Sequence, residues 1–255
     1  MSGLESIRSW RGFLLPALVL IGAEVNFAVN GIESASLAAP SQILSAGIKA
    51  LVDGRILVAT LQTIQSVLTG FLLGASLGVA LGIILGLQKY INYTSEISVE
   101  AARAIPPLAV LPIWMIICGL GYQMEIAIIA FSTMWPNAVM ARAAVANIEP
   151  RLLEVSRVIG LGPFARITKI ALPAALPRIF VALRLSMGFS LIIAVTVEII
   201  ANPQGVGSAI MVAQEVGDPA LMLAYLVWIG VIGFVLNIAM KWLETWAFQS
   251  HTAGS

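Results

Sequence analysis

Long apolar stretches separated by short polar segments fill most of this chain. Six of them approach the length of about 20 residues that an α-helix needs to cross a bilayer. These six stretches are Gly12–Asn30, Ile56–Leu87, Ala104–Leu120, Ile126–Ala141, Ile179–Ile200 and Leu221–Trp242. The pattern predicts an all-α membrane protein with six transmembrane helices.

The second stretch, Ile56–Leu87, is the longest and contains no charged residue. At about 1.5 Å of rise per residue it exceeds the thickness of a bilayer, so it must tilt or project. Glycine recurs at every fourth position, which places these residues in one groove where another helix can approach closely. The glycines are Gly70, Gly74, Gly78, Gly82 and Gly86. The sequence leaves open whether the packed helix belongs to this chain or to a partner subunit.

The third and fourth stretches are short and contain Pro106, Pro107, Pro112 and Pro136. Proline leaves backbone carbonyls without a partner, and at membrane depth this is tolerated only where protein or water covers them. We therefore expect these two helices to line the interior. Pro106 and Pro107 become candidates for lining a pathway through this interior.

Composition supports a membrane location and limits the chemistry. The chain is 59% hydrophobic and 11% charged, whereas soluble domains are about 25% charged. The single cysteine, Cys118, excludes an intrachain disulfide, and His251 is the only histidine. No G-x-x-x-x-G-K-[ST] motif is present. We expect no catalytic site, no metal site and no cofactor in this chain, and no basic block indicates binding to nucleic acid.

The basic residues predict the orientation. If both termini are cytoplasmic, eleven of the 14 Lys and Arg residues lie on the cytoplasmic side, and only Lys49 and Arg55 lie opposite. This asymmetry fits the positive-inside rule and predicts a multi-pass membrane protein with both termini in the cytoplasm. The segment 36–38 could be read as a signal cleavage site. The charge of Glu24 and the length of the run favour a retained first helix.

We divide the chain into an N-terminal helix with an extracytoplasmic segment (1–55), a transmembrane core (56–246) and a cytoplasmic tail (247–255). Within the core, the polar loop 147–178 predicts two short helices. The first begins at Pro150 and is capped by Gly160; the second begins at Pro163 and is ended by Pro173 and Pro177. The apolar face of the second helix, around Ile170, could rest on lipid headgroups or dock on a protein. The spacing of its apolar residues does not distinguish these two possibilities.

Five positions in this loop carry a family resemblance. They are Glu154, Gly160, Ile170, Leu172 and Pro173. Their spacing resembles the E-A-A-x3-G-x9-I-x-L-P signature of binding-protein-dependent ABC importer permeases, although Val155 and Ser156 replace its two alanines. In that family the loop is a coupling helix that seats on a cytoplasmic ATPase. The resemblance thus implies that these five residues couple to an ATPase.

Further segments resemble the nitrate, sulfonate, taurine and bicarbonate permeases of this family, over roughly residues 40–246. They are Ala39-Pro40-Ser41, Ile105-Pro106-Pro107-Leu108, Gly119-Leu120-Gly121 and Gly205-Val206-Gly207. The resemblance implies a type I ABC importer transmembrane domain that carries a small anionic solute. It also implies a homodimer, two ATPase subunits that bind ATP and Mg²⁺, and an extracytoplasmic solute-binding protein.

Three ionisable residues, Glu24, Arg184 and Glu198, lie inside predicted spans, where charges are costly. Arg184 either snorkels to the cytoplasmic surface or helps an anionic solute through. Glu198 either holds the outer loop 202–208 by hydrogen bonds or contacts solute. Gly205 and Gly207 in that loop belong either to an outer gate or to an ordinary turn.

Two other functions compete with an importer permease. A secondary transporter or channel not driven by ATP would need coupling-ion sites or a filter, but the sequence shows no acidic cluster and no internal repeat. A membrane enzyme would need a nucleophile with a base, or metal ligands, and His251 alone supplies neither. ATP dependence of uptake separates the importer from the first alternative.

Overall fold

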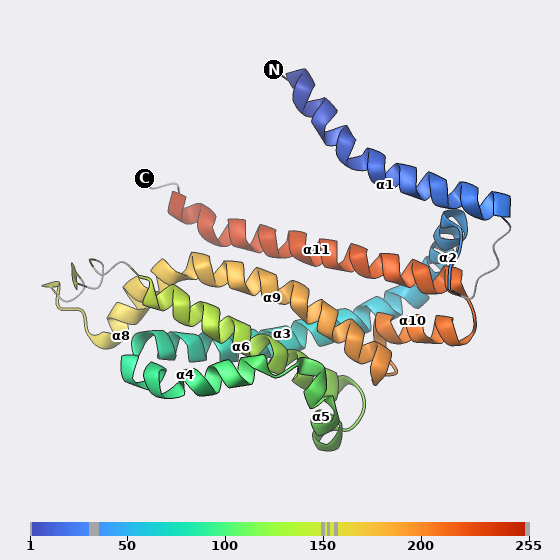
Figure 1. Cartoon of the computed structure of the whole chain (residues 1–255). Helices are drawn as coiled ribbons and strands as arrows, with labels where there is room; N and C mark the ends of the chain where they lie inside the picture. Colours follow the sequence, from blue (N-terminus) through green and yellow to red (C-terminus); the bar gives the residue numbers. More distant parts are fainter. Residues whose placement is uncertain (1, 31–35, 149–150, 152–153, 156–157, 253–255) are drawn as a thin grey trace.

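The computed structural model describes residues 2–30, 36–148, 151, 154–155 and 158–252, which form helices and no β-strand (Figure 1). The helices of the N-terminal half are α1 (Ser2–Asn30), α2 (Pro40–Val52), α3 (Arg55–Leu87) and α4 (Lys89–Ala104). Then come the 3-10 turn η1 (Pro107–Val110), α5 (Leu111–Cys118) and α6 (Tyr122–Ala146). The last are α8 (Pro163–Arg166), the π-helical turn η2 (Ile167–Ala171), α9 (Leu172–Ile200), α10 (Gly205–Glu215) and α11 (Pro219–Thr252).

Four helices of the described chain are long and apolar enough to cross a membrane, namely α3, α6, α9 and α11. They confirm the second, fourth, fifth and sixth predicted stretches. The helix α6 extends several residues beyond its predicted bounds at both ends, and α9 begins several residues before its predicted start. The helix α11 continues to Thr252 through most of the segment 247–255, which the sequence analysis treated as a tail.

The third predicted stretch, Ala104–Leu120, is not one helix, and this prediction was wrong. The helix α4 ends at Ala104, and α5 leaves it at an angle of 88°. The backbone of Ile105 (ψ 121°) and Pro106 (ψ 130°) is extended between them. Each of these residues precedes a proline, and that proline disfavours the helical conformation of the residue before it. If this bent pair is counted as one span rather than as a re-entrant loop, it is the fifth candidate of the described chain.

The first predicted stretch lies in α1, whose described apolar part, Leu14–Val29, is shorter than the other spans. The segment that follows forms the helix α2, which the sequence analysis did not predict. Glu24 of α1 accepts hydrogen bonds from the Ser41 backbone N–H (3.0 Å) and the Ser41 hydroxyl (2.6 Å). The first N–H groups of a helix lack intrahelical partners, so the Glu24 carboxylate caps the N-terminus of α2 by accepting from one of them.

The glycine groove of α3 packs against α6 of the same chain, which answers the question that the sequence left open. A Cβ atom added at Gly74 would lie 2.3 Å from the Ala130 carbonyl oxygen, and one at Gly78 would lie 2.3 Å from the Met134 oxygen. No larger residue fits at this distance from a neighbouring backbone. The helices α3 and α6 therefore form one closely packed pair along their length.

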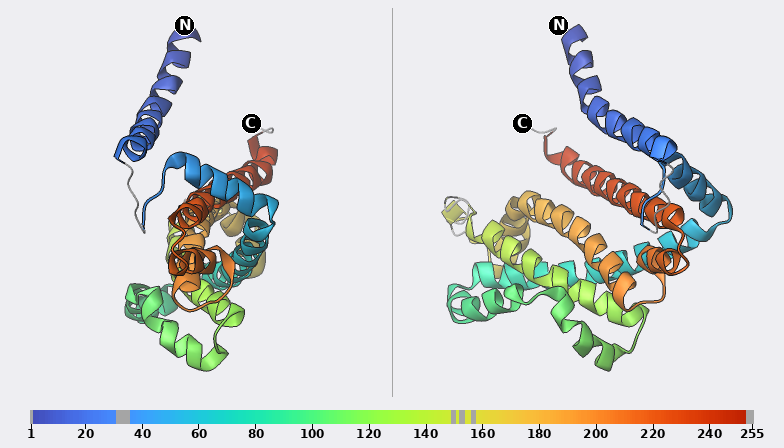
Figure 2. Two further views of the ribbon diagram at one scale, coloured as in Figure 1. Left: turned by 90° about the vertical axis from the view of Figure 1, so that its right-hand side faces the viewer. Right: turned by 45° about the vertical axis from the view of Figure 1, so that its right-hand side comes forward.

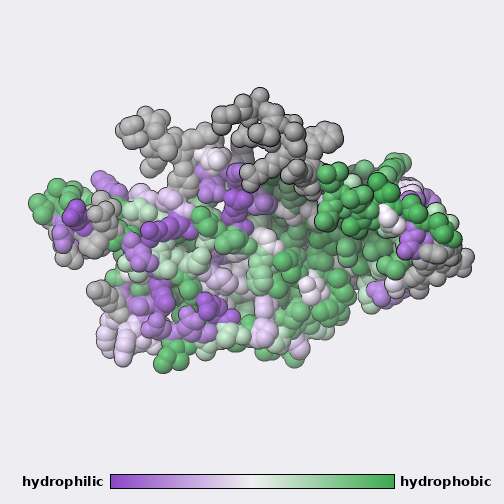
Figure 3. Space-filling model, turned by 45° about the horizontal axis from the view of Figure 1, so that its top comes forward, coloured by the Kyte–Doolittle hydropathy of each residue, from purple (hydrophilic) through white to green (hydrophobic). Residues whose placement is uncertain are grey.

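The packed helices have two ends that differ in their surroundings (Figures 1 and 2). We call the end that carries α8 the α8 end and the end that carries α10 the α10 end. Hydrophilic side chains gather on the part of the surface around α4 and α8, and apolar side chains cover much of the rest of the visible face (Figure 3). The main apolar core lies among α3, α6, α9, α10 and α11, and a smaller one joins α6 to α9 around Ala144 and Ala175.

The predicted second helix of the loop 147–178 does not end at Pro173 or Pro177. Instead α8, η2 and α9 follow one another without a break from Pro163 to Ile200. The wide turn η2 ends at Ala171, two residues before Pro173. Pro173 has no N–H to donate to the carbonyl four residues earlier. A π-helical turn allows a helix to continue past such a position. The loop thus runs straight into a long membrane helix.

Candidate functional site

Glu198 holds the start of α10 from its position near the end of α9. Its side chain is buried, with 2% of the residue exposed. The Gly207 N–H donates to Glu198 Oε2 at 2.7 Å, and the Thr63 hydroxyl donates to Glu198 Oε1 at 2.6 Å. Thr63 in turn accepts a hydrogen bond from the Val206 N–H at 2.9 Å. The carboxyl group of Glu198 therefore satisfies N–H groups that α10 cannot satisfy by itself.

Gly205 and Gly207 are required because Glu198 lies so close to them. A Cβ atom at Gly205 would lie 2.0 Å from Glu198 Oε1, and one at Gly207 would lie 2.4 Å from the Val195 oxygen. Gly205 also has a φ of +91°, which residues with a Cβ rarely adopt. The segment 205–207 is the first turn of a helix, whereas the sequence analysis treated it as part of a loop.

Glu125, near the start of α6, lies in the same buried cluster and is 0% exposed. Its Oε2 atom accepts hydrogen bonds from the Ser66 hydroxyl (2.9 Å) and from the side-chain amide of Asn202. Glu198, the other buried carboxyl group of this region, lies close to Glu125. We name these five residues, Thr63, Ser66, Glu125, Glu198 and Asn202, the carboxyl cluster.

The sequence analysis did not single out Glu125, because the predicted fourth stretch begins at Ile126, one residue later. It found no acidic cluster, because Glu125 and Glu198 lie far apart in the chain and meet only when α6 packs against α9. The available signal was a glutamate at the edge of an apolar stretch. Such a residue is usually taken to lie outside the membrane, and only its packed neighbours reveal its burial.

A cavity of about 660 Å³ opens beside the cluster at the α10 end. Its polar lining includes Arg55, Gln62, Gln204 and Tyr225. Gln62 Oε1 accepts a hydrogen bond from the Gly205 N–H at 3.0 Å, so this wall of the cavity is joined directly to α10. Any movement of α10 would thus change the shape of the cavity.

The five residues of the loop resemblance lie at the α8 end. Glu154 and Gly160 are exposed, and Gly160 has a φ of +70°, the left-handed conformation expected of a helix cap. Ile170 is half-buried in η2, while Leu172 packs against the smaller apolar core between α6 and α9. Pro150 and Ser156 lie outside the described residues, and so do the side chains of Phe164 and Ile167.

Arg184, in the half of α9 nearer α8, faces α11. Its Nε–H donates to Asn237 Oδ1 at 2.9 Å, and its Nη1 atom lies 3.7 Å from Glu244 Oε2. These three residues line a cavity of about 370 Å³ between the two helices. The arginine therefore has partners within the chain, whereas the sequence analysis considered only the membrane surface or a solute. It lies apart from the carboxyl cluster along α9.

Comparison with known proteins decides the family. The family described as "Binding-protein-dependent transport system inner membrane component" matches residues 78–249, most of the chain from the middle of α3 to α11. The chain belongs to this family. It is therefore a permease subunit of an ATP-driven importer, as its loop predicted.

Curated relatives and solved structures agree with this permease assignment. The chain is 28% identical to the "Putative aliphatic sulfonates transport permease protein SsuC" of Bacillus subtilis, over 92% of this chain and 85% of the relative. It is 27% identical to the "Bicarbonate transport system permease protein CmpB" of Synechococcus elongatus, over 75% and 69% of the two chains. The fold resembles a bacterial alginate ABC transporter, with a TM-score of 0.65, 16% identity and coverage of 94% and 96%.

In this permease, Pro106 and Pro107 lie at the break between α4 and α5 rather than inside a straight helix. Pro106 is exposed and Pro107 is half-buried. Neither belongs to the carboxyl cluster or to the Arg184 cavity. The structure thus separates the sequence-predicted pathway residues into three places: this break, the Arg184 cavity and the α10 end.

Proposed function

We propose that this permease imports a small anionic solute of the sulfonate or bicarbonate class, delivered by an extracytoplasmic binding protein. The names of the relatives support the solute class. Two copies of the chain would form the pathway above two ATPase subunits, which bind the ATP and Mg²⁺. The α8 end and both termini would face the cytoplasm of a bacterial cell, in keeping with the distribution of Lys and Arg.

The observation that best supports coupling through the loop is its continuity with α9. The exposed Gly160 turn leads through α8 and η2 directly into a helix that reaches the carboxyl cluster. A displacement of the loop by an ATPase would therefore move α9 rather than be absorbed by a flexible joint. Leu172 would transmit part of this movement to α6 through the smaller core.

The coupling proposal is tested by two substitutions at Gly160, where the φ of +70° matters and the surroundings are open. Asparagine adopts this conformation more readily than a β-branched residue does. We expect Gly160→Val to release the ATPase from the membrane and Gly160→Asn to retain it, as measured by co-purification. Ile170→Asp should also release it. Wild-type amounts of ATPase on both Gly160→Val and Ile170→Asp would refute the role of the loop.

Arg184 is proposed to attract the anionic solute through the cavity between α9 and α11. A matched pair of variants separates this role from a purely structural link. Arg184→Ala removes the positive charge, whereas Glu244→Gln removes only its ion-pair partner. If the charge attracts the solute, Arg184→Ala slows uptake and Glu244→Gln does not. Equal loss in both variants would instead indicate that the pair only joins the helices.

The solute class is tested by reconstitution. The permease, its ATPase and its binding protein would be placed in lipid vesicles, and uptake of taurine, bicarbonate and nitrate would be measured with and without ATP. We expect ATP-dependent uptake of one of these anions. Uptake that proceeds without ATP would favour a secondary transporter, and ATP-dependent uptake of only uncharged solutes would refute the anionic class.

A further inference from the structure

The hydrogen bonds of the carboxyl cluster imply a definite number of protons. Thr63 uses its oxygen to accept from the Val206 N–H, so its hydroxyl hydrogen is free to donate to Glu198 Oε1. The Gly207 N–H donates to the other oxygen of Glu198. Both oxygens of Glu198 are therefore acceptors, which is the arrangement of an ionised carboxylate.

Glu125 has a different set of partners. Its Oε2 atom accepts from Ser66 and Asn202, but no N–H or hydroxyl donor of the described residues reaches its buried Oε1 atom. Glu198 lies close by and already uses both of its oxygens as acceptors. An ionised Glu125 would therefore hold a buried negative charge with one oxygen unsatisfied, whereas a proton on Oε1 removes that charge.

No basic side chain offsets the cluster. None of the ion pairs between described residues includes Glu125 or Glu198, and Arg55, the basic residue of the neighbouring cavity, pairs with Asp53. Two neighbouring ionised carboxylates, both buried, would repel each other and lack counter-charge. A proton on one of them halves the charge, and the four donors around the pair stabilise the charge that remains.

We propose that Glu125 carries a proton beside the ionised Glu198, and that the carboxyl cluster clamps α9 and α10 to the α3–α6 pair. Thr63, Ser66 and Glu125 belong to α3 and α6, which the glycine groove holds together. Glu198 and the segment 202–207 belong to the end of α9 and the start of α10. The clamp therefore joins a tightly packed pair to the helix that continues from the coupling loop.

A pair of amide substitutions in the full-length permease in lipid nanodiscs tests the proposal. Glu125→Gln replaces a neutral acid with a neutral amide of nearly the same shape, whose oxygen can still accept from Ser66 and Asn202. Glu198→Gln turns an NH₂ group toward the Thr63 hydroxyl or the Gly207 N–H and leaves a buried donor without an acceptor. We expect Glu198→Gln to lower the melting temperature by about 5–10 °C. Glu125→Gln should lower it by no more than about 3 °C.

Infrared spectroscopy locates the proton independently of stability. The wild-type permease should show the carbonyl band of a buried protonated carboxylic acid, and Glu125→Gln should lack it. Absence of this band from the wild type would overturn the proposal. A band that persists in Glu125→Gln but vanishes in Glu198→Gln would place the proton on the wrong residue. Equal destabilisation by both substitutions, or failure of Glu125→Gln to fold, would also overturn it.

None of these measurements involves solute or ATP. Failure of the proposed solute class would leave the infrared and melting results unchanged, so the two proposals can fail separately. The inference depends on the fold of the permease and on the contacts of the carboxyl cluster alone.

Discussion

The α10 end and the α8 end of this permease are held together in different ways. At the α10 end, buried side chains of α3, α6, α9 and the segment after α9 surround Glu125 and Glu198 and hold the first turn of α10 by hydrogen bonds. At the α8 end, the described loop residues Glu154, Val155 and Gly160 are exposed. Few described contacts fix this segment beyond the Arg166 bond to the Leu161 oxygen.

The difference indicates where each end finds its partners. A buried polar cluster must be complete within the chain, because unsatisfied groups at membrane depth are costly. An exposed loop needs no internal partner and can present its surface to another protein. The carboxyl cluster therefore finds its donors within the chain, whereas the exposed loop at the α8 end is suited to docking. Four substitutions test this contrast.

The largest effect is expected from Gly78→Leu, which breaks the α3–α6 pair on which both ends rest. Its Cβ would meet the Met134 oxygen at 2.3 Å, so the helices must separate, at a cost of roughly 3 kcal/mol or more. We expect little folded permease after detergent extraction, measured by size-exclusion chromatography. Gly188→Leu is the control, because no atom lies within 4 Å of its Cβ. Equal yields would show that the groove does not hold the pair.

A smaller effect, confined to the α10 end, is expected from Gly205→Ala. The substitution strains a φ of +91° and drives a methyl group into Glu198, for about 2–4 kcal/mol in total. Gly217→Ala has similar backbone strain, with φ +71°, but open space around it. Thermal unfolding should therefore place Gly205→Ala well below Gly217→Ala. Similar melting temperatures would mean that contact with Glu198 does not fix α10.

At the α8 end, Leu172→Ala should cost about 1–2 kcal/mol, less than a fully buried leucine, because Leu172 is only half-buried. Loosening its contact with the smaller core should weaken the link between the loop and α6. ATP hydrolysis by the assembled complex should then depend less on the binding protein. Lys169→Ala, at an exposed position, is the control. Unchanged dependence in Leu172→Ala would exclude this route of transmission.

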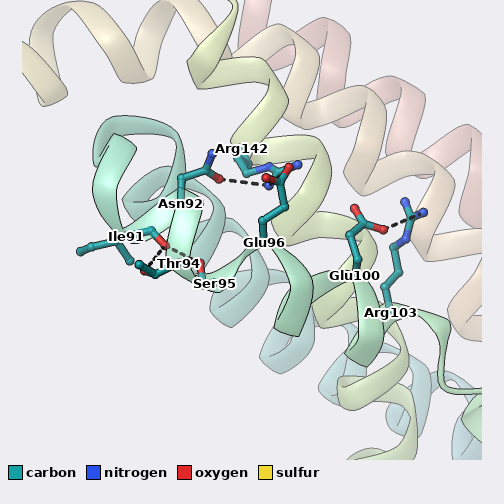
Figure 4. A network of polar contacts seen from close by, with 8 residues as sticks. All are labelled: Ile91, Asn92, Thr94, Ser95, Glu96, Glu100, Arg103 and Arg142. Carbon is teal, nitrogen blue, oxygen red and sulfur yellow. Dashed lines mark hydrogen bonds and ion pairs between the residues drawn. The ribbon is translucent and has the colours of Figure 1, made fainter.

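The smallest effect is expected from Arg142→Gln. Arg142 of α6 donates to Asn92 at 3.0 Å and lies 3.6 Å from Glu96, which joins α4 to α6 (Figure 4). The Glu96 side chain is 50% exposed, so the loss should be no more than about 1 kcal/mol. A melting temperature that falls as far as in Gly205→Ala would show that the α8 end depends on polar contacts as much as the α10 end does.

The sequence by itself determined the membrane class, the positions of four long helices and the family. Apolar stretches must be helical in lipid, because no water satisfies the backbone. The spacing from Glu154 to Pro173 lies within one local segment, so it can be read without knowledge of the fold. The glycine groove was predicted from its spacing of four residues, but its partner was not.

The tertiary structure alone decided which residues meet. Glu125 and Glu198 are distant in sequence, and their contact follows from the packing of α6 against α9. The sequence predicted a continuous helix across Pro106 and a helix end at Pro173, but the structure shows a break at Pro106 and a helix that continues through Pro173. Whether a proline interrupts a helix depends on the backbone conformation before it and on the residues packed around it. A proline after an extended residue separates two helices, whereas one after a π-helical turn is accommodated. Local sequence specified the helices, and long-range packing specified the buried carboxyl cluster.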